Sequence, residues 1–243
     1  MFITIKKWTM LYIFSLILLI CTFTAIIRYG DTVQTSQSIT LDSLRPVLVI
    51  DPGHGGEDGG AVAEDGTVES NINLSIAHKV AGLTEMAGWK VCMTRREDIS
   101  IHDTDAETLH QKKVSDLRNR VALCEEIGDC ILISIHQNSF PSAKSVYGAQ
   151  VFYNEKKVSE NLAQIIQDAL NQSVNQEKPK EIKSIGQSSY LMKHITCPGV
   201  LIECGYLSNQ KETQMLKTEA YQKKLALIIA SSLIQGIESE NYS

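Results

Sequence analysis

Three apolar runs in this sequence lead into ionisable side chains that could share one chemical site. The side chains are His54, His136 and Glu203, and the runs before them are Val47–Ile50, Ile131–Ile135 and Val200–Ile202. Burying such a group alone costs several kcal/mol, so each must be paired, hydrogen-bonded or metal-bound. The carboxyl ends of parallel strands meet at one edge of an α/β sheet, where these proteins bind their ligands. The three strand ends therefore predict one shared site.

The residue types at this edge favour a catalytic zinc ion. His54, Glu69 and His136 offer two imidazoles and one carboxylate, and such a set leaves a fourth position for water. Glu69 follows a glycine-rich loop and stands at the start of a predicted helix, which can return its N-terminus over the sheet edge. Glu203 ends its own strand, where a carboxylate can take a proton from the attacking water and pass it to a leaving amine.

Each of these residues also has a structural explanation. A histidine after a strand is more often a satisfied structural residue than a metal ligand. Glu69 could be only a helix-start carboxylate, and Glu203 could pair with a lysine. The loop at Gly53–Gly56 could cradle a phosphate, although it lacks the Gly-Lys-Ser/Thr ending of a P-loop. The occurrence of all four residues together favours the metal site.

The elements that would position these residues alternate along the chain. Amphipathic periodicity predicts helices from Ser70 to Gly88, around Leu117–Cys124, around Leu162–Leu170 and around Leu225–Ile237. Further strands are expected at Trp89–Thr94, Val146–Tyr153 and Tyr190–Met192, with polar connections at Arg95–Lys113 and Asn171–Lys183. This alternation predicts an α/β fold, a single domain with a twisted, mostly parallel sheet and helices on both faces.

The N-terminal residues have the character of an export segment. Lys6 and Lys7 precede an apolar run from Trp8 to Ile27, which Arg28 closes. About 20 apolar residues suffice to cross a bilayer, and the leading positive charges favour a cytoplasmic N-terminus. No small-x-small cleavage site follows clearly, which favours a signal anchor over a cleaved signal peptide. The expected divisions are 1–28 for this segment, 29–45 for a polar tether, 46–238 for the exported catalytic domain and 239–243 for a tail.

Composition narrows the choice of partners. The formal net charge is −5, and the chain beyond residue 30 holds 20 basic and 28 acidic residues without a basic run. Such a surface argues against nucleic acid as a partner.

Five cysteines lie in the expected exported part, none in a Cys-x-x-Cys pair: Cys92, Cys124, Cys130, Cys197 and Cys204. We expect mainly buried free thiols, with one disulfide left open.

Five motifs in order resemble the zinc-dependent N-acetylmuramoyl-L-alanine amidases, which are bacterial cell-wall hydrolases. They are the segments Val49–Gly56, Glu69–Leu74, Thr94–Arg95, Ser134–Asn138 and Leu201–Asn209, and the resemblance spans Pro46 to Ile237. It implies a twisted mixed sheet, zinc held by His54, Glu69 and His136, and Glu203 as catalytic acid/base. It also implies hydrolysis of the amide between N-acetylmuramic acid and the L-alanine of the stem peptide in peptidoglycan.

Within that family, the chain is most similar to germination-specific members that act on the spore cortex. It has one short domain, an N-terminal membrane segment and no wall-binding repeats. The resemblance implies a step towards muramic lactam, with a deacetylase and a lipoprotein activator as partners. It also implies a location at the extracytoplasmic face of the membrane or in the cell wall. For a germination-specific member, that location is the spore envelope.

Three other functions stay open at this point. One is a vegetative autolysin of the same activity, and another is a non-catalytic wall-binding scaffold. The third is a zinc carboxypeptidase, for which Arg95, Arg118 and Arg120 are the candidates to clamp a free carboxylate.

Overall fold

The computed structural model describes residues 15–25, 45–186 and 188–239. The chain forms two units, residues 1–45 and 46–243. In the first unit, residues 15–25 are helical. Within the described ranges, no helix has both the length and the apolar character needed to cross a membrane. Both ends of the predicted membrane segment, at Trp8 and Ile27, lie outside those ranges, as does nearly all of the tether. The membrane anchor therefore stays a prediction.

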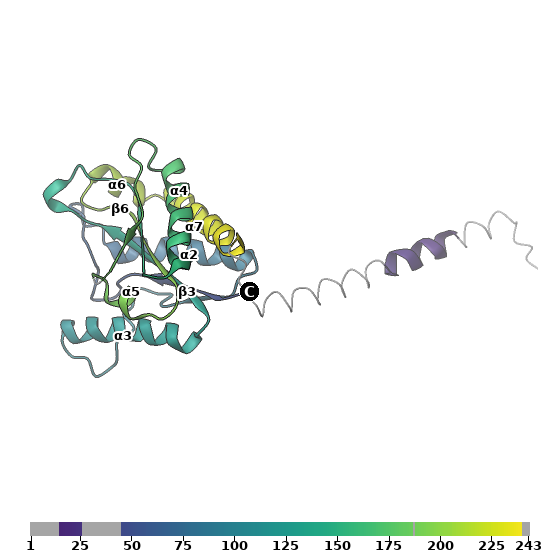
Figure 1. Cartoon of the computed structure of the whole chain (residues 1–243), viewed down its shortest axis with the longest axis horizontal. Coiled ribbons are helices and arrows are strands. Elements are labelled where there is room, and N and C mark those ends of the chain that lie inside the picture. Colours follow the sequence, from purple (N-terminus) through teal and green to yellow (C-terminus); the bar gives the residue numbers. More distant parts are fainter. Residues whose placement is uncertain (1–14, 26–44, 187, 240–243) are drawn as a thin grey trace, which may run out of the picture. The chain divides into compact units, whose positions relative to one another are not determined.

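The second unit is built on one six-stranded sheet (Figure 1). In sheet order, its strands are β2 (Val91–Met93), β1 (Val47–Pro52), β3 (Cys130–Asn138), β6 (Gly199–Tyr206), β4 (Gln150–Tyr153) and β5 (Lys183–Ser184). Neighbouring strands run parallel except for β4 and β6, which are antiparallel. The prediction of a mostly parallel, mixed sheet is confirmed.

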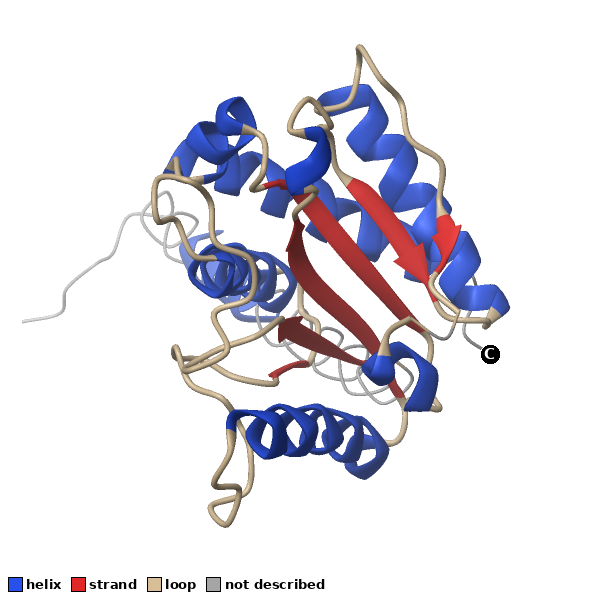
Figure 2. Cartoon of the chain, turned by 90° about the vertical axis from the view of Figure 1, so that its left-hand side faces the viewer, coloured by secondary structure: helices blue, strands red, loops and turns tan. Residues whose placement is uncertain are grey.

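Helices cover both faces of this sheet (Figure 2). They are α2 (Glu69–Met86), α3 (Leu109–Ile127), α4 (Lys157–Ser173), α5 (Tyr190–His194), α6 (Gln210–Leu216) and α7 (Glu219–Ser239), with a 3-10 turn at Pro141–Ala143. The apolar side chains of α2, α4 and α7 share one core cluster with the sheet. Side chains of α3 and α5 form a second cluster on the opposite face. The sheet is therefore enclosed, as its apolar strands require.

Strand alternation decides which side chains face which helical layer. Leu48 and Ile50 belong to the cluster of α2, α4 and α7, whereas Val49 between them packs with α3 and α5. The same alternation holds in β3 and β6, because successive side chains point to opposite faces. By this alternation, Asp51, Ser134, His136 and Glu203 are among the polar residues on the α3 side of the sheet.

The expected strand at Tyr190–Met192 is wrong, because this segment is the helix α5. The Ser189 side chain caps it by accepting a hydrogen bond from the backbone N–H of Met192 at 3.4 Å. Two boundaries also differ from those predicted. Strand β4 begins at Gln150 rather than Val146, and α3 begins at Leu109, where Thr108 and Gln111 form a reciprocal capping box.

Candidate active site

The loop after β1 holds His54 in an unusual backbone conformation. His54 has φ 62°, the only positive φ of a non-glycine residue within the described ranges. Two buried guanidinium groups bind the loop: Arg95 donates to the carbonyl of Gly53 at 3.1 Å, and Arg120 donates to the carbonyl of His54 at 2.9 Å. Strained backbone of this kind persists where the surroundings determine it, and it is common at functional sites. The loop therefore presents the His54 ring in a fixed position.

Glu69 is the first residue of α2 and is only 3% exposed. Its Oε2 accepts a hydrogen bond from the backbone N–H of Ala61 at 2.8 Å. Its Oε1 accepts from the backbone N–H of Gln137 at 3.1 Å and from Asn73 Nδ2 at 3.2 Å. The carboxylate is thus held between the glycine-rich loop, its own helix and β3.

The structure brings His54, Glu69 and His136 together. One ligand atom from each lies within 4.8 Å of the others. Glu69 Oε1 is 3.0 Å from His136 Nδ1 and 3.5 Å from His54 Nε2. Two glycines leave room for these side chains, since a Cβ would lie 2.1 Å from the ring of His136 at Gly53 and 2.5 Å from the carboxylate of Glu69 at Gly60. The three predicted ligands therefore share one compact site.

The electrostatics of this group favour an ionised carboxylate. Burial alone would raise the pKa of Glu69, but the hydrogen bond with His136 and the charges of both imidazoles lower it to about 2. Burial would lower the pKa of His136, yet the carboxylates of Glu69 and Glu203 raise it. The acidic groups thus offset the cost of burying a positive charge here.

Glu203 lies beside this group on the neighbouring strand. It is the register partner of His136 across β3 and β6, and of Gln150 on the other side. Its Oε2 is buried and has no hydrogen-bond partner. Burial raises the pKa of Glu203 to about 7, with the charge of Glu69 adding to this and that of His136 opposing it. Glu203 therefore has an available oxygen and titrates near neutral pH.

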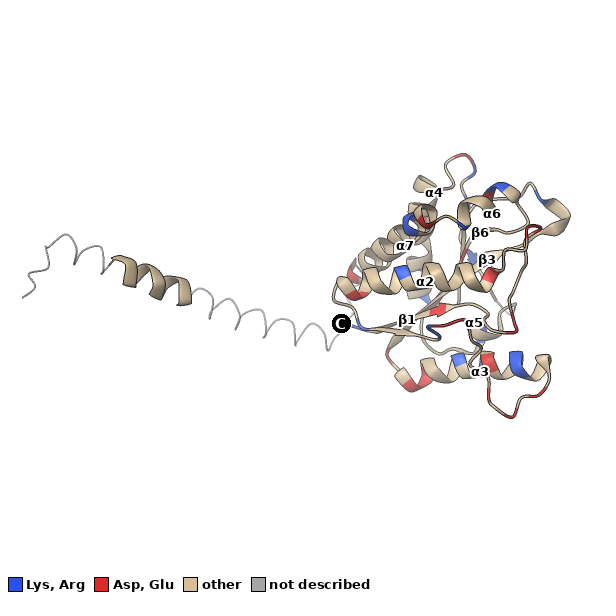
Figure 3. Cartoon of the chain, turned by 180° about the vertical axis from the view of Figure 1, so that it is seen from behind, with Lys and Arg blue, Asp and Glu red and all other residues tan. Residues whose placement is uncertain are grey.

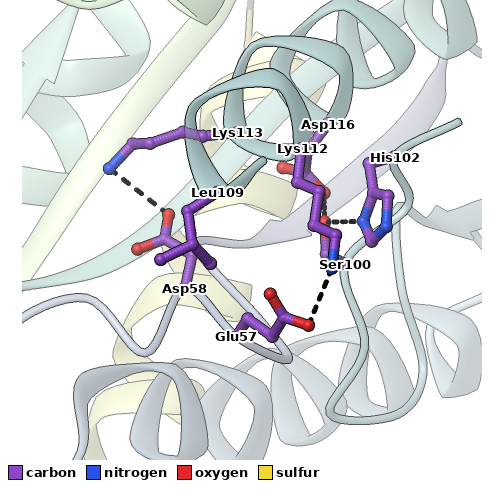
Figure 4. A pocket seen from close by; sticks show the side chains of 8 residues that line it. All are labelled: Glu57, Asp58, Ser100, His102, Leu109, Lys112, Lys113 and Asp116. Carbon is purple, nitrogen blue, oxygen red and sulfur yellow. Dashed lines mark hydrogen bonds and ion pairs between the residues drawn. The ribbon is translucent and has the colours of Figure 1, made fainter. Parts of the chain in front are cut away.

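Asp58 joins the histidine group to α3, although its role was not predicted from the sequence. Its Oδ2 lies 2.9 Å from His54 Nδ1. The same oxygen lies 3.4 Å from Lys113 Nζ, and Figure 4 shows this second contact. The hydrogen bond with His54 lowers the pKa of Asp58 below its usual range. Because Asp58 contacts the nitrogen opposite Nε2, it orients Nε2 towards Glu69.

Two cavities adjoin the residues described above. One of about 260 Å³ lies beside His54 and His136, on the α3 side of the sheet. The other, of about 140 Å³, lies between α3 and the loop of Glu57 and Asp58 (Figure 4). In the second cavity, Glu57 pairs with Lys112 at 2.8 Å. Helix α3 carries both acidic and basic residues (Figure 3), and its Lys112 and Lys113 pair with Glu57 and Asp58 of the loop.

A buried ion-pair network underlies the site and was also missed. The carboxylate of Asp51, 1% exposed, binds Arg120 and accepts from Thr94 Oγ1 and Ser134 Oγ, both at 2.7 Å. Arg120 Nε also donates to Asp116 Oδ2 at 2.7 Å. The position of Asp51 at the end of a buried apolar strand was the available signal, because such a carboxylate must be paired.

This network bears on the carboxypeptidase hypothesis. The guanidinium of Arg120 is bound by Asp51 and Asp116, and that of Arg95 by backbone carbonyls including those of Pro52 and Ser70. Neither is available to clamp a substrate carboxylate.

The polar connection from Arg95 to Lys113, with His102 and His110, forms no group of three metal-ligating side chains in the described part of the chain.

Comparison with known proteins identifies the family. A model described as N-acetylmuramoyl-L-alanine amidase matches residues 48–235, which include the histidine group and Glu203. The chain belongs to the N-acetylmuramoyl-L-alanine amidase family. The amidase is 39% identical over 194 residues to the germination-specific N-acetylmuramoyl-L-alanine amidase of Bacillus subtilis strain 168, covering 79% of this chain and 78% of the relative.

Solved amidases have the same fold. The CwlD amidase of Clostridioides difficile, in complex with the GerS lipoprotein, matches with TM-score 0.77 and 36% identity over 80% of this chain and 100% of that one. An N-acetylmuramoyl-L-alanine amidase from Clostridium difficile 630 matches with a TM-score of 0.69 and 27% sequence identity. The match covers 81% of this chain and 99% of that chain. The enzyme therefore has N-acetylmuramoyl-L-alanine amidase activity on peptidoglycan, and the scaffold and carboxypeptidase hypotheses are set aside.

Proposed function

We propose that the amidase binds zinc through His54, Glu69 and His136 and uses Glu203 as its catalytic acid/base. The observation that carries this proposal is the approach of three ligand atoms to within 4.8 Å beside a buried carboxylate oxygen that has no partner. Two imidazoles and one carboxylate are a set that catalytic zinc takes. When bound, zinc would polarise the scissile carbonyl and lower the pKa of water.

The chain's own residues account for the proton transfers. The partnerless Oε2 of Glu203 accepts a proton from the attacking water and later donates it to the amine of the leaving L-alanine. A pKa of about 7 suits both directions of transfer at neutral pH. Asp58 holds the His54 ring through Nδ1, and the Gln137 N–H and Asn73 hold Glu69.

We further propose that the substrate is spore-cortex peptidoglycan and that the reaction is a step towards muramic lactam. The similarity to the germination-specific amidase of Bacillus subtilis supports this substrate. A lipoprotein activator is supported by the similarity to CwlD, which was solved in complex with GerS. A deacetylase would complete the lactam step. The protein would act outside the cytoplasm, anchored through residues 1–28.

The roles in the site are tested with Glu203→Gln, which keeps the side-chain shape and removes the base. We expect the release of stem peptides from peptidoglycan, followed by mass spectrometry, to fall by about 10²- to 10⁴-fold while bound zinc is retained. Glu160→Gln on α4, whose carboxylate pairs with Lys157 in solvent, is the matched control and should keep full activity. A Glu203→Gln enzyme near the wild-type rate would overturn the assigned role. The assay should include the candidate lipoprotein.

The cortex role is tested in a sporulating bacterium that lacks its own germination-specific amidase. Expression of the wild-type chain should restore muramic lactam to the cortex, whereas Glu203→Gln should not. The wild-type chain could instead fail to restore muramic lactam while still releasing stem peptides from vegetative cell wall. That result would favour a vegetative autolysin.

A further inference from the structure

A second group of potential metal ligands lies apart from the amidase site. Cys124 in α3, Cys130 at the start of β3 and Cys197 before β6 have their Sγ atoms within 4.8 Å of one another. They are 2%, 2% and 6% exposed, and the structure holds all three as free thiols. Cys130 and His136 lie on the same face of β3, and six residues of strand separate them by about 20 Å. The cysteines therefore form a distinct cluster.

The spacing of this cysteine cluster suits a metal ion bound by sulfur. Metal–thiolate bonds of about 2.3 Å put the sulfur atoms of a trigonal site about 4 Å apart. The separations of up to 4.8 Å thus need only a small contraction. Cys124 and Cys130 lie six residues apart, on either side of the turn at Gly128, whereas Cys197 comes from a segment that is distant in sequence. An odd number of thiols also cannot be consumed by disulfides within the cluster.

The surroundings of the cysteine cluster are apolar. Its neighbours in the core are Val49, Leu132, Leu191, Met192, Ile195 and Leu201. Free thiolates would be unfavourable in such surroundings, because an unpaired charge loses its solvation there. A divalent ion with three thiolates carries a net charge of only −1. Soft sulfur donors in a buried site favour thiophilic ions over magnesium or calcium.

We propose that Cys124, Cys130 and Cys197 form a structural site for a thiophilic divalent cation of the zinc and cadmium class. On binding, each of the three thiols releases its proton to solvent and its sulfur donates an electron pair to the ion, without any redox change. The ion would tie α3 to the sheet at the opposite end of the helix from Lys112 and Lys113. Helix α3 also carries Arg120, which donates a hydrogen bond to the carbonyl of His54. The ion would therefore also help to fix the position of the His54 loop in the amidase site.

The test uses the reduced full-length chain titrated with cadmium alone. Thiolate-to-cadmium charge transfer gives an ultraviolet absorption that imidazole and carboxylate ligands do not give. We expect this absorption to saturate at one ion per chain. The thermal unfolding temperature should rise as cadmium is added, because the folded state holds the three thiols together and binds the ion more tightly than the unfolded chain does. Cys92→Ala, which removes a thiol outside the cluster, should leave the absorption unchanged, whereas Cys197→Ala should abolish most of it.

One further variant separates this site from the amidase site. Glu69→Gln should weaken metal binding at the amidase site and stop the release of stem peptides, yet keep the cadmium–thiolate absorption. No such absorption in the wild type, or its loss in Cys92→Ala, would overturn the proposal. So would a count of thiols in the purified, denatured protein showing that two of the three cluster cysteines are joined in a disulfide. The absorption and the thiol count of the wild-type protein do not depend on whether a cysteine variant folds.

Discussion

His136 and Glu203 are register partners on the adjacent parallel strands β3 and β6. Both side chains lie on the α3 side of the sheet, so the imidazole of one strand stands beside the carboxylate of the next. A one-residue slip of this register would turn one of the two side chains to the opposite face. The strand pairing itself thus positions Glu203, the proposed acid/base, next to His136, a proposed metal ligand.

Removing the charge of Asp51 should destabilise the domain strongly. Asp51→Asn leaves the buried guanidinium of Arg120 with one carboxylate fewer, and breaking a buried pair in this way costs about 3–5 kcal/mol. Urea unfolding measures the change in the free energy of unfolding. Ser134→Ala removes only one hydrogen bond to the same carboxylate and should cost about 1 kcal/mol. Equal, small losses in both variants would show that the ion pair is not essential to the fold.

Replacing Asp58 should weaken metal binding without unfolding the protein. Asp58→Asn removes the charge that faces His54 Nδ1, and losing such a partner weakens metal affinity by about 10- to 100-fold. The measurement is the free zinc concentration at half-maximal release of stem peptides. Lys113→Met is the control, because it removes only the exposed contact on the other side of Asp58. An unchanged zinc requirement in Asp58→Asn would contradict an orienting role.

A methyl group at Gly53 should displace His136. The Cβ in Gly53→Ala would lie 2.1 Å from His136 Cε1 and 2.2 Å from Nε2, so the ring must move. A displacement of about 1 Å can cost about 100-fold in rate, and we expect a loss of that order in turnover. The far-ultraviolet circular dichroism spectrum should stay native. Gly82→Ala in α2, where a Cβ meets nothing within 4 Å, should keep wild-type turnover. Normal activity in Gly53→Ala would mean that the ring position is not critical.

The raised pKa of Glu203 predicts a pH-dependent stability of the metal-free protein. Its pKa is about 7 in the folded state, against an ordinary value of 4.5 in the unfolded chain, so the unfolded state releases this proton at lower pH. As pH rises from about 4.5 to 7, wild type should therefore lose up to about 3 kcal/mol of stability relative to Glu203→Gln, and no more above that range. Urea unfolding of both proteins with a chelator present measures this difference. A difference that is constant with pH would contradict the raised pKa.

The sequence predicted the strand ends well because buried apolar strands leave few positions for ionisable groups. His54 follows β1, whereas His136 and Glu203 follow their apolar runs but lie within β3 and β6, which continue past them to Asn138 and Tyr206. Glu69 follows the glycine loop, so residue types and order were still sufficient to select the four residues. The cooperating residues were harder to predict. Asp58 looks like any loop acid in the sequence, and its contact with His54 appears only once the path of the loop is known. Tyr190–Met192 resembles a short strand in sequence, yet it forms the helix α5 with Ser189 as its N-cap.

The most direct measurement of the proposed metal centre is anomalous scattering at the zinc absorption edge from crystals of the protein. We expect a zinc peak among His54 Nε2, His136 Nδ1 and the carboxylate of Glu69, with Glu203 facing its open side. A zinc-loaded, active protein with no peak among these three residues, or with a peak only at the cysteine cluster, would contradict the assignment.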